Sequence, residues 1–212
     1  MSIGLTGSHR TGKTTLAKAF GEKFEMHVCL TSASHVFQTL GYSPQEDYPI
    51  DIRLDIQEAI LKDFARQYKE ASDVSNRAFI TDRTPIDLMA YTLADISRHA
   101  LSEELENRLA RYVQGCLNLC NKYFSTLIVI QPGIELVADA TKAPIGRAYI
   151  EHISQIVMGL TVDERVDAMH FYIPKRITDL DTRVLCVQGA VNQAQVRLMG
   201  EIEYSDGAVS IH

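Results

Sequence analysis

An eight-residue segment near the N-terminus, Gly7-Ser-His-Arg-Thr-Gly12-Lys13-Thr14, carries the residue types that hold a polyphosphate. It fits the pattern G-x-x-x-x-G-K-[ST] without a mismatch. The two glycines let backbone amides approach phosphate oxygens, and the N-terminus of the following helix adds a favourable dipole. The Lys13 ammonium suits the β- and γ-phosphates, and the Thr14 hydroxyl suits Mg²⁺. This Walker A loop therefore predicts binding of a nucleoside triphosphate, ATP with Mg²⁺.

We expect the whole loop and the start of the helix behind it to contact the nucleotide. The predicted contacts are Gly7, Ser8, His9, Arg10, Thr11, Gly12, Lys13, Thr14 and Thr15. His9 and Arg10 occupy the variable positions of the pattern, so we expect no catalytic role for either. Lys13 is predicted to be catalytic, because a transferring phosphoryl group develops charge that a cation offsets.

A second pair of charged residues, Asp82-Arg83, follows the apolar run Ala78-Phe-Ile-Thr. A carboxylate at the tip of a strand beside the loop can hold the magnesium shell or take a proton from an attacking group. An arginine next to it can neutralise phosphate charge. We therefore predict that Asp82 and Arg83 are catalytic and that Asp82 joins Thr14 at the metal. The alternative is that Asp82 only caps the helix that begins at Thr84.

The elements that would position these groups alternate along the chain. Strands are predicted at 2–5, 28–31, 78–81, 127–131 and 171–174. Helices are predicted at 14–24, 34–40, 51–72, 84–96, 102–121, 147–158, 180–191 and 193–203. Alternation of this kind predicts parallel strands with helices on both faces. We expect a P-loop NTPase type of α/β fold: a three-layer sandwich around a mostly parallel five-stranded sheet, as one domain over 1–212.

Composition narrows the class of function. The net charge of −6 argues against a broad basic surface for nucleic acid. No apolar run approaches the roughly 20 residues that span a bilayer, and the N-terminus lacks a signal-peptide layout. The four cysteines include no CxxC pair, so we expect reduced thiols in a cytoplasmic protein rather than a zinc site.

Two segments resemble the small P-loop nucleoside and nucleotide kinases. They are Gly7-Ser-His-Arg-Thr-Gly-Lys-Thr-Thr-Leu-Ala17 and Asp82-Arg-Thr-Pro-Ile-Asp87-Leu-Met-Ala-Tyr91. The closest likeness is to the ribosylnicotinamide-kinase-like branch of AAA domains, with thymidylate and deoxynucleoside kinases further off. The resemblance implies ATP-dependent transfer to a nucleoside, nucleotide or related small acceptor. It implies that Asp82 is the base or a magnesium-shell ligand, that Arg83 contacts the acceptor, and that Asp87 steadies the loop rather than reacts.

The order of the predicted elements places a helical insertion at about 33–75, between the second and third strands, where it would cover the substrate. The resemblance implies a second accessory segment, a basic lid at about 133–150 that would close over the triphosphate. Lys142 and Arg147 are the lid cations, and Arg147 is counted among the predicted catalytic residues. A solvated surface loop is the alternative, because the segment has fewer arginines than other lids.

Three further residues are weaker candidates for substrate contacts. Arg53 and Gln57 lie four apart on the predicted helix at 51–72, in the region that contacts the acceptor in related kinases. The alternative for both is a solvent-facing stripe. Arg183 either approaches the adenine or lies on the surface.

Other interpretations of function stay open. The acceptor is alternatively a hydroxymethylated pyrimidine in DNA, which the net acidity disfavours. The chain is alternatively an NTP-dependent switch or binding module, which a single compact domain disfavours. Related kinases are often dimers, so a homodimer is a further possibility that the sequence does not decide.

Overall fold

A five-stranded sheet runs through the middle of the molecule. The computed structural model describes residues 2–43, 46–76, 78–96, 100–136 and 146–207. The strands are β1 (Ile3–Thr6), β2 (His27–Cys29), β3 (Phe79–Thr81), β4 (Thr126–Ile130) and β5 (Met169–Ile173). Their order in the sheet is β2-β3-β1-β4-β5, and every neighbouring pair is parallel. The carboxyl ends of all five strands therefore meet at one edge.

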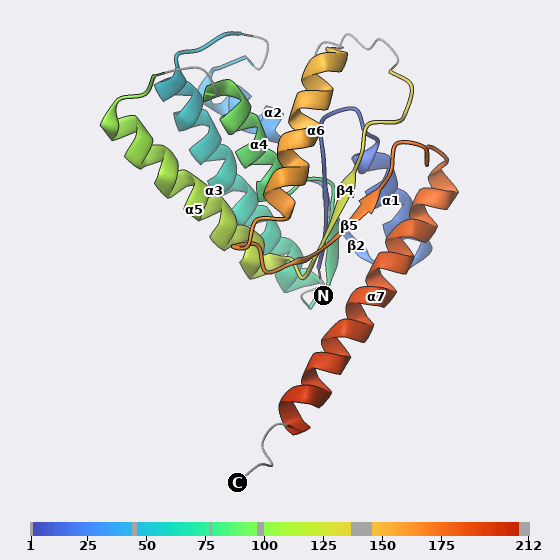
Figure 1. The fold of residues 1–212 in the computed structure, drawn as a ribbon. Helices are drawn as coiled ribbons and strands as arrows, with labels where there is room; N and C mark the ends of the chain where they lie inside the picture. The colour runs from blue at the N-terminus through green and yellow to red at the C-terminus, as the bar shows by residue number, and fades with distance from the viewer. Residues whose placement is uncertain (1, 44–45, 77, 97–99, 137–145, 208–212) are drawn as a thin grey trace.

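Helices cover both faces of this sheet (Figure 1). They are α1 (Lys13–Lys23), α2 (Ala33–Leu40), α3 (Ile50–Val74), α4 (Pro85–Ile96), α5 (Glu103–Tyr123), α6 (Arg147–Thr161) and α7 (Leu180–Gly207). One face carries α1 and α7, and the other carries the group α3, α4, α5 and α6. The predicted three-layer α/β sandwich of P-loop NTPase type is confirmed, with a sheet that is entirely parallel.

Two apolar clusters hold the layers together, one on each face of the sheet. Leu16 and Phe20 of α1 pack with Val187 of α7 in the smaller cluster. Burial of both sheet faces explains why β1 and β4 are uniformly buried, with near-continuous apolar sequences. Because both faces of these strands are covered, their sequences do not alternate between polar and apolar residues. They could instead be recognised in the sequence as short apolar runs.

The larger cluster extends, through Tyr68 of α3, to the edge of the sheet where the carboxyl ends of the strands meet. Its buried ring packs edge-on against Phe124, with ring centroids 5.1 Å apart. Its hydroxyl donates a 2.8 Å hydrogen bond to the backbone carbonyl of Arg83. The core of α3 thus fixes the backbone that follows β3, where the second predicted charged pair lies.

The C-terminal helix differs from the prediction of two separate helices. The interruption predicted near Asn192 is wrong, because α7 runs unbroken through this position. The side chain of Gln188 donates a 2.7 Å hydrogen bond to Asn192 one turn later, so asparagine is accommodated in the helix surface. Asp179 caps the start of this helix, because its carboxylate accepts hydrogen bonds from the amide and hydroxyl of Thr182 at 2.8 and 2.7 Å.

The four cysteines are free thiols, and three of them, Cys29, Cys116 and Cys120, are buried. Burial raises the pKa of the Cys116 and Cys120 thiols to about 12, so both stay protonated and behave as small apolar side chains. In the described part of the chain, no helix has the length and apolar character needed to cross a membrane.

Candidate active site

The predicted phosphate loop lies between β1 and α1 and needs glycine at both ends. Gly7 has φ 143° and Gly12 has φ 78°, both in a region that favours glycine. A Cβ at Gly7 would lie 2.6 Å from the carbonyl oxygen of Ile130, and one at Gly12 would lie 2.7 Å from Cδ1 of Ile134. Substitution at either position would therefore push the loop away from β4 and the residues after it.

Burial divides the predicted nucleotide contacts into two groups. The inner members, Gly7, Ser8, Thr11 and Lys13, are buried, whereas Thr14 and Thr15 are exposed and the remaining positions His9, Arg10 and Gly12 are intermediate. Two buried polar atoms beside the loop, Oγ of Ser8 and Nη2 of Arg183, have no hydrogen-bond partner. A loop with buried cations and unsatisfied polar atoms suits an anionic ligand.

Lys13 lies folded under the loop with 6% of its surface exposed. Its ammonium donates hydrogen bonds to the carbonyls of Gly7 and Ser8 at 2.6 and 2.7 Å. Burial lowers the pKa of Lys13 to about 8, although the nearby Asp87 carboxylate acts in the opposite direction. The ammonium is therefore close to losing its proton until a further negative charge stabilises it.

Asp87 ties the start of the loop to α4. One carboxylate oxygen accepts hydrogen bonds from the Gly7 amide at 2.7 Å and the Thr6 hydroxyl at 3.0 Å. The other accepts from the Thr84 amide at 2.8 Å. The side chain is fully buried, and these contacts agree with the expectation that Asp87 steadies the loop.

Asp82 meets the loop at the end of β3. It accepts a 2.6 Å hydrogen bond from the Thr14 hydroxyl and a 3.1 Å hydrogen bond from the Thr31 amide. The predicted metal pair, Thr14 and Asp82, is thus in direct contact. The alternative in which Asp82 caps α4 does not match this geometry, because the carboxylate faces Thr14 and Thr31 while Asp87 accepts from the Thr84 amide.

A chain of side chains continues from Arg83 to the outer side of the loop. The Tyr91 hydroxyl accepts a 2.9 Å hydrogen bond from the His9 amide and lies 3.1 Å from His9 Nδ1. The Arg83 guanidinium interacts with the same hydroxyl; burial opposes its charge, but Tyr91 and two nearby carboxylates raise the pKa of Arg83 overall. The Tyr149 ring lies 6.0 Å from the His9 ring and 6.4 Å from that of Tyr91. These contacts place Arg83 and the first turn of α6 beside the loop.

The two lid candidates have different outcomes. Lys142 falls outside the described residues. Arg147 is the first residue of α6 and is exposed, two positions before Tyr149. A cation in the first turn of a helix opposes the helix dipole. Helix stability alone therefore does not account for arginine at this position.

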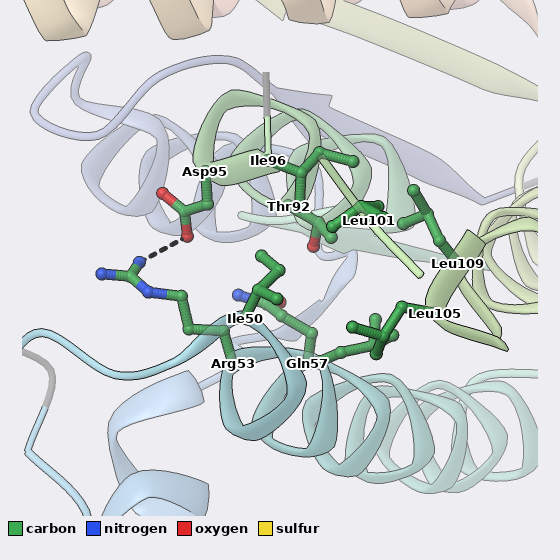
Figure 2. Close-up of a pocket in the computed structure, with 10 residues that line it drawn as sticks. Ile50, Arg53, Gln57, Thr92, Asp95, Ile96, Leu101, Leu105 and Leu109 are labelled. Carbon is green, nitrogen blue, oxygen red and sulfur yellow. Dashed lines mark hydrogen bonds and ion pairs between the residues drawn. The ribbon is translucent and has the colours of Figure 1, made fainter. Parts of the chain in front are cut away.

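Arg53 and Gln57 do not form the solvent-facing stripe that was the alternative for them. Both line a pocket between α3, α4 and α5, shown in Figure 2. Arg53 makes a 2.7 Å ion pair with Asp95 at one end of it, and apolar side chains such as Leu105 and Leu109 lie at the other. Oε1 of Gln57 is buried without a partner. The cavity measures only about 10 Å³, which is room for about one water molecule.

Arg183 is not on the surface, so that alternative is wrong. Only 1% of the residue is exposed. Its guanidinium donates to the carbonyl of Thr11 at 2.8 Å and to that of Ile177 at 2.7 Å. It lies behind the phosphate loop, against Gly12, where a Cβ would be 3.3 Å from Nη1.

The sequence interpretation gave no role to Thr31 or Tyr91, although both lie in the site. Thr31 follows β2, which neighbours β3, so the rule that parallel strands end at one edge could have placed it near Asp82. Tyr91 lies four residues after Asp87, which puts both on the same face of α4. The contact between Arg183 and Thr11 joins residues 172 positions apart, and no local pattern indicates it.

Comparison with known proteins agrees with this geometry. The sequence matches the family described as AAA domain over residues 2–135. This is more than half of the 212 residues, and the chain belongs to that family.

Solved structures extend the likeness over the whole fold. A deoxyadenosine kinase from M. mycoides with bound dCTP superimposes with a TM-score of 0.62 at 14% identity, covering 91% of this chain and 100% of that one. The NadR protein in complex with NAD and AMP-PNP gives a TM-score of 0.64 at 13% identity, covering 90% of this chain and 49% of that one. No curated protein matches the sequence. At such low identity the structures establish a P-loop nucleoside-kinase-like fold and leave the substrate undetermined.

The role of Asp87 can be tested with Asp87→Asn. The amide group would turn a donor toward the Gly7 or Thr84 amide, leaving a buried donor unpaired at a cost of about 3 kcal/mol. We expect this loss in the free energy of unfolding, measured by urea titration, together with weaker ATP binding. Asp181→Asn, an exposed change in the first turn of α7, serves as the control. Equal stability of the two variants would contradict the role given to Asp87.

The lowered pKa of Lys13 predicts how nucleotide binding depends on pH. Below about pH 8 the ammonium is charged in the free protein and in the complex, so this group causes no change in affinity. Above about pH 8 the free protein has lost the proton, and binding of phosphates must take it up again. We expect the Kd for ATP to rise by up to about tenfold per pH unit there.

Calorimetry near pH 7 and pH 9, in two buffers of different ionisation heat, would detect the proton uptake. Lys13→Arg is the matched control, because arginine remains charged throughout this range. If the wild-type affinity is the same at both pH values and no proton is taken up, the proposed position of the Lys13 proton is wrong.

Proposed function

We propose that the chain is a kinase that transfers the γ-phosphoryl group of ATP to a nucleoside, nucleotide or related small acceptor. The observation that carries the proposal is the contact between the phosphate loop and the end of β3, where the Thr14 hydroxyl donates to Asp82 at 2.6 Å. It brings a hydroxyl suited to a metal ion, a carboxylate and the adjoining Arg83 together at the edge where ligands bind in parallel α/β sheets.

The orientation of the Thr14 hydroxyl supports a magnesium site. A hydroxyl has one proton and two lone pairs. Because the proton points to Asp82, the lone pairs are left to face a cation. Among the described residues there is no group of three or more His, Cys, Asp or Glu that could enclose a metal. This composition suits Mg²⁺, which takes one or two protein ligands and completes its shell with water and phosphate oxygens.

The remaining loop residues suit the phosphates. When bound, ATP with Mg²⁺ would supply the phosphoryl group and much of the charge neutralisation. The loop amides and Lys13 would bind the phosphate chain, Arg83 would offset charge on the acceptor side, and Arg147 would approach from the start of α6. Asp82 would orient the metal shell through its Thr14 contact, or hold the acceptor proton on a carboxylate oxygen.

The acceptor side lies along Tyr149 and the Arg53–Asp95 pair. Burial raises the pKa of Tyr149 to about 12, and Asp95, Tyr91 and Arg53 are its charged or titratable neighbours. These groups form a polar path from His9 of the loop to the mouth of the α3–α5 pocket. The pocket itself has room for about one water molecule, so we assign the acceptor to this path rather than to the pocket.

Transfer of labelled γ-phosphate tests the proposal directly. Purified protein would be incubated with labelled ATP, Mg²⁺ and a panel of ribonucleosides, deoxynucleosides, nicotinamide riboside and nucleoside monophosphates. We expect transfer to at least one small acceptor. Lys13→Ala and Asp82→Asn should each lower the rate by about a hundredfold or more, as loss of a charge-stabilising group does. Asp181→Asn should transfer at the wild-type rate.

Two further measurements separate the alternatives. Transfer to hydroxymethylated DNA but to no small molecule would replace the proposal with the DNA-base kinase. Slow hydrolysis that no acceptor accelerates would favour the switch or binding module instead.

A further inference from the structure

Arg183, near the start of α7, is a buried cation behind the phosphate loop. Figure 1 shows α7 alongside α1, the helix that begins at the end of the phosphate loop. The guanidinium spans from the carbonyl of Ile177 to the carbonyl of Thr11 and is only 1% exposed as a residue. It thus contacts the side of the loop opposite to the one expected to bind phosphates.

Among the described residues, Arg183 lacks a partner that balances its charge. In the part of the chain that the structure describes, no carboxylate forms an ion pair with it, and Nη2 has no hydrogen-bond partner. Burial correspondingly lowers the pKa of this group. Buried charges in folded proteins are normally paired, because an uncompensated one is costly. Since no described carboxylate pairs with this cation, an anion bound at the loop would stabilise it.

Lys13 differs from Arg183 in this respect. The carboxylates of Asp87 and Asp82 both raise the pKa of Lys13 and so offset part of its burial. Arg183 instead has two neutral carbonyls, and one of them, that of Thr11, belongs to the loop. The Thr11 carbonyl and the Gly12 N–H belong to one planar peptide group, so holding the carbonyl also fixes the direction of that N–H.

We propose that Arg183 is a positioning residue for the phosphate loop, and that its buried charge is compensated by the phosphate chain of a bound nucleoside triphosphate. This inference rests on the proposed binding of ATP at the loop. The guanidinium holds the Thr11 carbonyl on the inner side of the loop and adds positive potential at the outer side. It acts through the loop and not on a substrate atom, since only 1% of the residue is exposed.

A purely structural tie between α7 and the loop makes the opposite prediction. In that case removal of the guanidinium would lower the thermal midpoint of the free protein and leave the ATP affinity of the folded protein unchanged. A charge that is uncompensated in the free protein instead costs stability there, so its removal should lower affinity while sparing the free protein.

The variants Arg183→Met and Arg183→Lys separate these possibilities. Arg197→Met, an exposed substitution of the same type on the same helix, is the matched control. The readouts are the thermal midpoint of the free protein and the calorimetric Kd for MgATP, MgADP and tripolyphosphate. Neither depends on turnover.

For Arg183→Met we expect a thermal midpoint within about 3 °C of wild type, which is about 1 kcal/mol for a chain of this size. We expect the Kd for MgATP to rise about tenfold, with a smaller rise for MgADP because it carries less charge. Arg183→Lys should keep most of the affinity, because it keeps the charge. Arg197→Met should match wild type in every readout.

The proposal is overturned if Arg183→Met binds MgATP like wild type, if it loses stability or fails to fold, or if Arg183→Lys is as weak as Arg183→Met. Failure of the wild-type protein to bind MgATP or tripolyphosphate would instead remove the proposed function on which the inference rests. The two failures are therefore distinguishable in one set of titrations.

Discussion

The Lys13 ammonium is held beneath the phosphate loop by the carbonyls of Gly7 and Ser8, where water reaches it poorly. A cation in such a position is stable only if negative charge is close. The fold supplies part of it through Asp82 and Asp87, which reach the loop from β3 and α4. The other contacts at the carboxyl ends of the strands hold this cation, the loop amides and the two carboxylates in fixed relative positions.

The parallel sheet is what makes this arrangement possible. β1 and β3 are neighbours, so the loop after β1 and Asp82 after β3 emerge side by side. β2 is the next strand outward, and it brings Thr31 to the same carboxylate. The core then reaches the edge directly through Tyr68, whose hydroxyl holds the Arg83 carbonyl. Stability of the α3 face and geometry of the site are therefore coupled.

The sequence predicted the parts of the site that depend on local spacing or on strand ends. The loop from Gly7 to Thr14 is a contiguous pattern, and Asp82 follows a recognisable strand. Two other features could not be predicted, because they depend on which helices meet. Gln57 is covered by its neighbours only because α4 and α5 pack over that turn of α3. The burial of Arg183 depends on α7 lying against the loop. The break predicted near Asn192 failed because a side-chain hydrogen bond within the helix accommodates the asparagine.

Every role given to the residues of the site requires that the loop around Lys13 binds a polyphosphate with magnesium. Equilibrium titration of the purified wild-type protein with a non-hydrolysable ATP analogue, with and without Mg²⁺, tests it most directly. We expect saturable binding of one analogue molecule per chain, strengthened by Mg²⁺ and abolished by tripolyphosphate in competition. A folded protein that shows no binding of any purine triphosphate in the presence of Mg²⁺ would contradict it.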